Sequence, residues 1–234
     1  TVDECEMLSD AASGSDLLCM TGFNRRFAPM VQKMHEVLLN CSGPKLITYR
    51  VNAGPQSRES WVYDPAHAQG RIIGEVCHFV DLFRYLTGEE PVGIHAQALG
   101  DASSAIRLEN IAATLEFSGG SLATLTYTAE GSPLVGKERI EVFCDGTAMT
   151  MDDFKSLTIR GRERVDIKAR RPDKGHRAEL NHFFRTILGS GSPVIVLEDG
   201  IIATRICVEL VENARRSVCE IEPPSAERSE GKTP

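Results

Sequence analysis

The sequence lacks the features that mark several large classes of protein. Its seven cysteines are widely scattered and form no Cys-x-x-Cys pair, which disfavours a disulfide framework and a zinc ribbon. No hydrophobic run approaches the roughly 18 residues needed to cross a bilayer, and the N-terminus has no signal-peptide pattern. The net charge of -7 is the wrong sign for nucleic-acid binding. We therefore expect a cytoplasmic protein with no nucleic-acid or membrane partner.

The periodicity of the apolar residues predicts helices and strands along most of the chain. Residues 2–12 are predicted to form a helix, residues 16–24 a strand, and the segment from Pro29 to Leu38 a helix that begins with a first-turn proline. Further strands are predicted at residues 45–54, 92–98, 110–117, 121–130, 140–144, 147–151, 156–160 and 164–168, and two closing helices around residues 180–188 and 198–218.

The order of these elements predicts the fold class. Hairpin signals, of which Asp145-Gly146 is the strongest, join successive strands into a meander. Helices gathered on one face of an open, mostly antiparallel sheet make an α+β domain. The second face of the sheet then has no cover, and strand 121–130, with Thr124, Leu125, Thr126 and Tyr127, is either half solvated or packed against a second copy. A homodimer through the open sheet face is therefore one hypothesis.

The segment GRIIGEVCHFVDLFRYLTG, residues 70–88, carries the pattern with most chemical content. Its apolar side chains gather on one broad face of a helix, and the run ends at a glycine. Three ionisable residues, Glu75, His78 and Asp81, recur at intervals of three along the border of that face. Glu75 and His78 can touch at this spacing.

Two interpretations of this spacing are open. In the first, partial burial at a helix edge shifts the pKa values of the imidazole and the carboxylate, which suits proton transfer near neutral pH. In the second, Glu75 caps backbone amides at the helix start and His78 pairs with Asp81. A metal site that combines Glu75, His78, His67 or His95 is disfavoured, because their positions match no metal-ligand spacing.

A longer series of segments resembles a known family. In order these are GFNRRFAP, KLITYRVNAG, a loop with the only tryptophan, GRIIGEVCHFVDL, EEPVGIHAQA, GHRAELNHFF and EDGIIATRICVELVENARRS. Together they resemble the C-terminal domain of the glucose-fructose oxidoreductase / inositol dehydrogenase (Gfo/Idh/MocA) family over residues 1–220. The resemblance implies a domain like the C-terminal domain of dihydrodipicolinate reductase.

The resemblance also implies roles for the residues of the central helix. The family has a His-x-x-Asp pair there, matched by His78 and Asp81, and its histidine acts at the sugar or polyol carbon that exchanges hydride with the nicotinamide. His78 is thus the implied proton-transfer residue. Many members have an aspartate four positions before the histidine, where this chain has Gly74. The acid is Glu75 instead, which makes Glu75 a candidate for the aspartate's part.

Further site residues are implied at the crossing between the two domains of such proteins. The family's Asn-x-Arg-Phe turn is matched by Asn24, Arg26 and Phe27. The implied role of this turn is to bind substrate or cofactor, and the alternative for Arg26 is a salt bridge that fixes the crossing. Three more residues are expected to face the same cleft as substrate-binding groups, with a packing role as the alternative for the tryptophan: Asn52, Trp61 and Asp64.

The motifs of the family's cofactor domain are not in this sequence. It contains no Gly-x-Gly-x-x-Gly turn and no Glu-Lys-Pro, so NAD or NADP is expected in a full-length protein and no cofactor on this chain alone. Residues 1–24 are then expected to be the remnant helix and last strand of an absent Rossmann domain. Residues 25–221 are expected to form the substrate-binding and dimerisation domain, and residues 222–234 a disordered tail.

The sequence is compatible with two functions, one enzymatic and one non-catalytic. The first is the C-terminal domain of an NAD(P)-dependent oxidoreductase that acts on a hydroxyl carbon of a sugar, sugar derivative or polyol, with the isolated chain inactive. The second is a non-catalytic module for oligomerisation or for binding a sugar or a protein partner. The coding sequence upstream discriminates between them, because a dinucleotide-binding turn there favours the enzyme.

Overall fold

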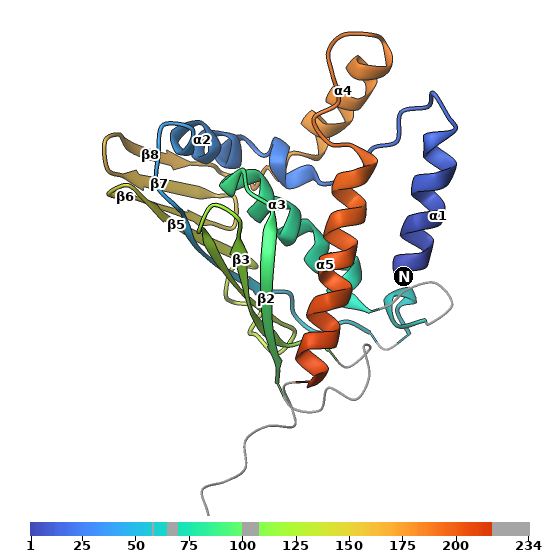
Figure 1. Ribbon diagram of the computed structural model, residues 1–234. Coiled ribbons are helices and arrows are strands. Elements are labelled where there is room, and N and C mark those ends of the chain that lie inside the picture. Colours follow the sequence, from blue (N-terminus) through green and yellow to red (C-terminus); the bar gives the residue numbers. More distant parts are fainter. Residues whose placement is uncertain (58, 65–69, 100–107, 217–234) are drawn as a thin grey trace, which may run out of the picture.

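A single open sheet organises the chain in the computed structural model, which describes residues 1–57, 59–64, 70–99 and 108–216. The eight strands lie in the order β2-β3-β4-β1-β5-β6-β7-β8 (Figure 1). Their bounds are Leu46–Asn52 (β1), Pro91–Ala98 (β2), Ile111–Phe117 (β3), Leu122–Thr128 (β4), Glu138–Cys144 (β5), Thr147–Asp152 (β6), Ser156–Arg160 (β7) and Arg164–Lys168 (β8).

All neighbouring strands in the sheet pair antiparallel except β1 and β4, which are parallel. The β5–β6 turn has positive φ at both central residues, 52° at Asp145 and 71° at Gly146, as a tight two-residue hairpin requires. The predicted fold class, an open and mostly antiparallel sheet with helices, is therefore confirmed.

Among the described residues, five α-helices accompany the sheet: α1 Val2–Ser13, α2 Pro29–Leu38, α3 Cys77–Thr87, α4 His176–Ile187 and α5 Leu197–Arg216. Helices α2, α3 and α5 cover one face of the sheet, α1 packs against the outer side of α5, and α4 projects away from the sheet (Figure 1). None of the helices in the described part of the chain is long and apolar enough to span a membrane.

The core lies between the covered face of the sheet and the helices. Strand β4 shows how period two divides its residues, because Leu125 and Tyr127 are buried against the helices while Thr124 and Thr126 point to the open face. Of the four residues named for this strand, only the two threonines are therefore available to solvent or to a second copy on the open face. An apolar row also crosses the open face, in which Leu46 pairs with Leu122 on one side and Phe143 on the other.

Two segments differ from the sequence-based expectations. Residues 16–23 form no strand, and Leu17 is largely exposed. The apolar pattern of this segment is compatible with a strand. A strand, however, needs a neighbouring strand to hydrogen-bond its backbone, and the described residues place no strand beside this segment. In α4 the apolar side chains Leu180, Phe184 and Ile187 are exposed rather than packed on the core.

Candidate proton-transfer site

The helix that carries the central pattern begins with an unusual turn. Residues Ile72–Val76 form a single π-helical turn that leads directly into α3. Wide turns of this kind are rare and are frequently found at functional sites. Gly70, with φ of 86°, precedes the turn, and Gly88, with φ of 71°, ends α3 in the left-handed conformation. The extra residue of the π turn changes the direction in which Glu75 points relative to His78.

His78 lies half-buried where α3 meets the chain before η1, the short 3-10 turn Asn24–Phe27. Its ring packs edge-on against Phe23, with 5.5 Å between centroids. Its Nδ1 atom is buried and has no hydrogen-bond partner among the described residues. Burial, and after it the positive charge of Arg25, lower the pKa of His78 to about 4. The imidazole is therefore neutral at pH 7 and is able to accept a proton.

A buried ion cluster around Glu138 forms one side of this environment. Arg25 donates two hydrogen bonds of 2.9 Å to the Glu138 carboxylate, Lys174 donates one of 2.6 Å and the Tyr49 hydroxyl one of 2.5 Å. The Glu138 side chain is fully buried. Burial acts to raise the pKa of Glu138, but the Arg25 and Lys174 bonds outweigh it and lower the pKa to about 2. Glu138 is therefore ionised and pairs with both cations, and the charges of Glu138 and Arg25 both act on the pKa of His78.

Glu75 occupies the other side of His78. Its carboxylate accepts a 2.8 Å bond from the buried Arg71 and lies 3.7 Å from the Nζ atom of Lys137. Burial acts to raise the pKa of Glu75, but the bond with Arg71 and the charges of Arg71 and Lys137 give a net lowering. Glu75 therefore acts on His78 through its negative charge, which opposes the lowering of the His78 pKa.

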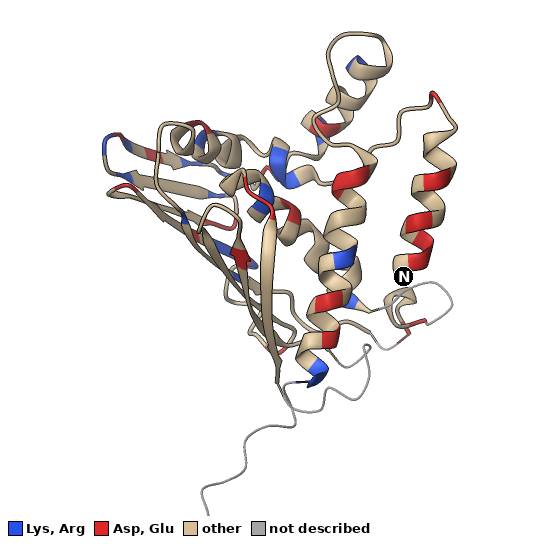
Figure 2. Cartoon of the chain, in the orientation of Figure 1, with Lys and Arg blue, Asp and Glu red and all other residues tan. Residues whose placement is uncertain are grey.

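Asp81 does not pair with His78. It is fully buried and forms a two-bond ion pair with Arg26. Arg26 also bonds Asp199 at 3.1 Å, which joins η1 to the acidic first turn of α5 (Figure 2). Burial raises the pKa of Asp81 to about 6 even though Arg26 acts to lower it. The second interpretation of the sequence spacing, a cap by Glu75 and a His78–Asp81 pair, is therefore wrong, because Arg71 and Arg26 supply the counter-charges.

The remaining expected site residues do not converge on His78 in the same way. Asn24 is buried and donates a 2.7 Å bond to the backbone oxygen of Lys174. Asn52 is buried under the loop after β4, where its amide donates to two backbone oxygens, at residues 132 and 135. Trp61 is 68% exposed, so it is not the packing cover considered above, and Asp64 is also exposed.

Sequence reasoning missed the buried ion cluster beside His78, which consists of Arg25, Glu138 and Lys174. One signal for them was present in β5, where Glu138 precedes Ile140 and Val142 at positions that share one face of the strand. An acid at an inward-facing position needs buried cations, because an isolated charge is too costly to bury. No such signal marked Arg25, because the sequence does not show which of the adjacent Arg25 and Arg26 pairs with a buried acid.

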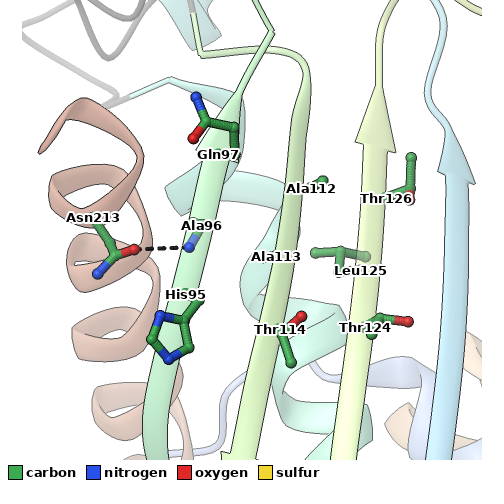
Figure 3. A pocket seen from close by; sticks show the side chains of 10 residues that line it. All are labelled: His95, Ala96, Gln97, Ala112, Ala113, Thr114, Thr124, Leu125, Thr126 and Asn213. Carbon is green, nitrogen blue, oxygen red and sulfur yellow. Dashed lines mark hydrogen bonds between the residues drawn. The ribbon is translucent and has the colours of Figure 1, made fainter. Parts of the chain in front are cut away.

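Some other sites are not formed by the described residues. No group of three or more His, Cys, Asp or Glu among them could hold a metal ion, and His67 lies outside them. A hollow of about 430 Å³ lies over β2, β3 and β4 between His95 and Thr126, with Asn213 of α5 bonded to the edge of β2 at Ala96 (Figure 3). It is a shallow feature of the sheet and is separate from the His78 site.

Comparison with known proteins supports the family resemblance. Residues 46–149 match the model of the GFO/IDH/MocA C-terminal domain. A curated relative, the myo-inositol 2-dehydrogenase of Thermotoga maritima, is 22% identical over 216 residues, which cover 86% of this chain and 63% of the relative. The chain thus spans less than two thirds of that relative's length.

Solved structures share the fold at low sequence identity. The aldose-aldose oxidoreductase of Caulobacter crescentus, solved with glycerol, superposes with a TM-score of 0.78 at 21% identity and covers 93% of this chain and 68% of its own. The UDP-N-acetylglucosamine 3-dehydrogenase of Acidithiobacillus ferrooxidans superposes with a TM-score of 0.74 at 18% identity, covering 92% and 67%. At these identities the likeness establishes the fold alone.

Proposed function

Because the chain contains a GFO/IDH/MocA C-terminal domain, we propose that it is the substrate-binding part of an oxidoreductase that acts on a hydroxyl carbon of a sugar, sugar derivative or polyol. Proteins of this family are in general NAD(P)-dependent oxidoreductases. The relatives named above, a myo-inositol 2-dehydrogenase and an aldose-aldose oxidoreductase, support the substrate class. The substrate of this protein is then a compound with several hydroxyl groups.

The observation that carries the proposal is the state of His78. Oxidation of an alcohol to a carbonyl releases the hydroxyl proton, and a neutral imidazole is a suitable acceptor for it. His78 is kept neutral by burial, and its Nδ1 atom has no hydrogen-bond partner among the described residues. We assign it the role of proton acceptor for the substrate hydroxyl.

The charged residues beside His78 set how readily it takes that proton. Glu75 favours the protonated imidazole and Arg25 opposes it. Asp81 acts on the site indirectly, because its ion pair with Arg26 fixes η1 against α3. In this proposal Asn24 and Arg26 shape the wall of the substrate site, Asn52 shapes the neighbouring loop, and the exposed Trp61 and Asp64 lie at its rim.

The cofactor is assigned outside this chain. A nicotinamide supplies hydride transfer in such enzymes, and a dinucleotide is usually held by a glycine-rich turn at a helix N-terminus. The sequence has no Gly-x-Gly-x-x-Gly turn, so its residues do not fit NAD or NADP. We propose that this chain is inactive alone and that a separate Rossmann domain completes the enzyme.

The same proposal includes a homodimer through the open sheet face. The apolar row on that face consists of Leu46, Leu122 and Phe143, which are 47%, 41% and 44% exposed. These residues are cross-strand neighbours, and so they form one continuous strip rather than scattered contacts. A second copy related by a twofold axis would cover the strip with the same strip of its own.

Substrate binding near His78 is testable on this chain by nuclear magnetic resonance. Cyclic polyols and aldoses, beginning with myo-inositol, are added while the imidazole signals of the histidines are followed. The expected result is a saturable change in the His78 signal, with the exposed His95 of the open face unchanged as the internal control. If none of the compounds affects His78, or if His95 changes equally, the proposed site is wrong. Binding to this chain without turnover in the longer protein would favour the non-catalytic module.

A further inference from the structure

Two cysteines that are far apart in the sequence meet at one end of the sheet. Cys41 follows α2, and Cys144 is the last residue of β5. The residue after each cysteine joins the two segments, because the amide and hydroxyl of Ser42 donate bonds of 3.1 and 3.0 Å to the same Asp145 oxygen. The Cys144 thiol also lies 3.3 Å from the backbone oxygen of Gly43. The residues directly after Cys41 are therefore held against the β5–β6 turn next to Cys144.

The two thiols differ in accessibility. Cys144 is buried, whereas Cys41 is half-buried, with its sulfur 3.6 Å from the backbone oxygen of Val37. Burial raises the pKa of the Cys144 thiol, and the adjacent Cys41 thiol raises it further through its charge and by hydrogen bonding. The two thiols therefore lie close together where the loop after α2 is bonded to the β5–β6 turn through Ser42, Gly43 and Asp145. Both are free thiols in this structure, and no third ligand completes a metal site among the residues described.

The other cysteines in the described part of the chain offer no equivalent arrangement. Burial, and in addition the nearby Cys77, raise the pKa of the Cys207 thiol, but Cys207 is fully buried on the inner side of α5. No oxidant reaches that sulfur without opening the core. Cys5 is buried and Cys19 is exposed.

We propose that Cys41 and Cys144 are a thiol pair that closes to a reversible disulfide by exchange with a low-molecular-weight disulfide. The Cys41 thiolate attacks one sulfur of the small disulfide, forming a mixed disulfide and releasing one small thiol. The Cys144 thiol then loses its proton and attacks the Cys41 sulfur, which releases the second small thiol. In the balance the two cysteines lose two electrons and two protons, and one small disulfide is reduced to two thiols.

Two measurable consequences follow from closing this pair. Because the thiolate is the attacking species, and because Cys144 is protonated at neutral pH, ring closure is faster at higher pH. The cross-link also ties the end of α2 to the β5–β6 hairpin, so the oxidised chain melts at a higher temperature than the reduced chain. A reducing thiol reverses both the cross-link and the increase in melting temperature.

The test uses the native chain treated with oxidised glutathione at pH 7 and pH 9, without denaturant. Intact mass and peptide mapping are expected to show the loss of two hydrogen atoms and a linked pair of Cys41 and Cys144 peptides, formed faster at pH 9. The Cys144→Ser variant is expected to stop at a glutathione adduct on Cys41. The matched control, Cys19→Ser, changes an exposed cysteine and is expected to form the link at the wild-type rate.

Two outcomes would overturn the proposal. In one, the wild-type chain gains glutathione only at Cys19 and no peptide linked between Cys41 and Cys144 appears. In the other, the Cys144→Ser variant loses two hydrogen atoms as readily as the wild type, which would place the disulfide between other cysteines. Far-ultraviolet circular dichroism of each variant checks that the fold is retained, so that both outcomes refer to the native chain.

Discussion

Replacing Glu138 by glutamine tests the buried ion cluster that supports the proposed site. The substitution keeps the size and shape of the side chain but removes the charge that pairs with Arg25 and Lys174. Breaking a buried pair by neutralising one partner costs about 3–5 kcal/mol, since a charge is left uncompensated. An independent route gives a similar value. The pKa of Glu138 falls from 4.5 to about 2 in the folded protein, and at ~1.4 kcal/mol per pKa unit this corresponds to about 3 kcal/mol.

The assay is urea unfolding of the chain at pH 7, followed by circular dichroism. Glu141→Gln is the matched control, because Glu141 lies on the same strand but on the open face, where it is partly exposed and pairs with Arg139 at 2.9 Å. An exposed pair contributes about 0–1 kcal/mol. We expect Glu138→Gln to lower the free energy of unfolding by about 3 kcal/mol more than Glu141→Gln does. Equal losses for the two variants would refute the account of the cluster.

Three further predictions address the packing of η1 on Gly175, the titration of His78 and the open face of the sheet. Gly175→Ala places a Cβ 2.3 Å from the backbone oxygen of Asn24 at φ of 88°, so it should lower the free energy of unfolding by about 3 kcal/mol or more. The control is Gly189→Ala, also at positive φ but in open space, which should lower the free energy of unfolding by only about 1 kcal/mol in urea unfolding. Equal losses for the two variants would contradict the close packing of η1 on Gly175. His78 should titrate in the folded chain with a midpoint about 4 by nuclear magnetic resonance. Because the unfolded chain binds this proton more tightly, the free energy of unfolding should fall as the pH decreases from 6.5 towards 4. A midpoint near 6.5 would contradict the burial of a neutral His78. Leu122→Arg, in the apolar row of the open face, should convert the proposed dimer to monomer in analytical ultracentrifugation, whereas Asn181→Arg on the exposed side of α4 should not; a dimer that survives Leu122→Arg would exclude this interface.

Much of the fold was predictable because local signals and the tertiary structure agree. The Asp145-Gly146 turn, the first-turn Pro29 and the terminal Gly88 each mark an element boundary by backbone chemistry that acts locally. The strand predicted for residues 16–24 was wrong for the complementary reason. Its apolar pattern is compatible with a strand, but strand formation depends on a partner that a local pattern does not contain.

The candidate site was predictable only in part. His78 and Asp81 stand out because charged residues interrupt an apolar helix, but their partners come from distant parts of the chain. The Arg26–Asp81 pair spans 55 residues and the Arg25–Glu138 pair spans 113. Spacing along one helix reveals which groups share a face, and it does not reveal which counter-charges another segment brings. The expected His78–Asp81 contact was wrong for this reason.

The most direct test of the central claim is the turnover of the longer oxidoreductase that we propose contains this domain. With its cofactor domain present, the rate of oxidation of the best polyol or sugar is measured for the wild type, His78→Gln and His95→Gln. Loss of a general base lowers kcat by about 100-fold to 10,000-fold. We predict a loss in that range for His78→Gln, with substrate binding retained and with His95→Gln equal to the wild type. A His78→Gln enzyme with wild-type kcat would contradict the account.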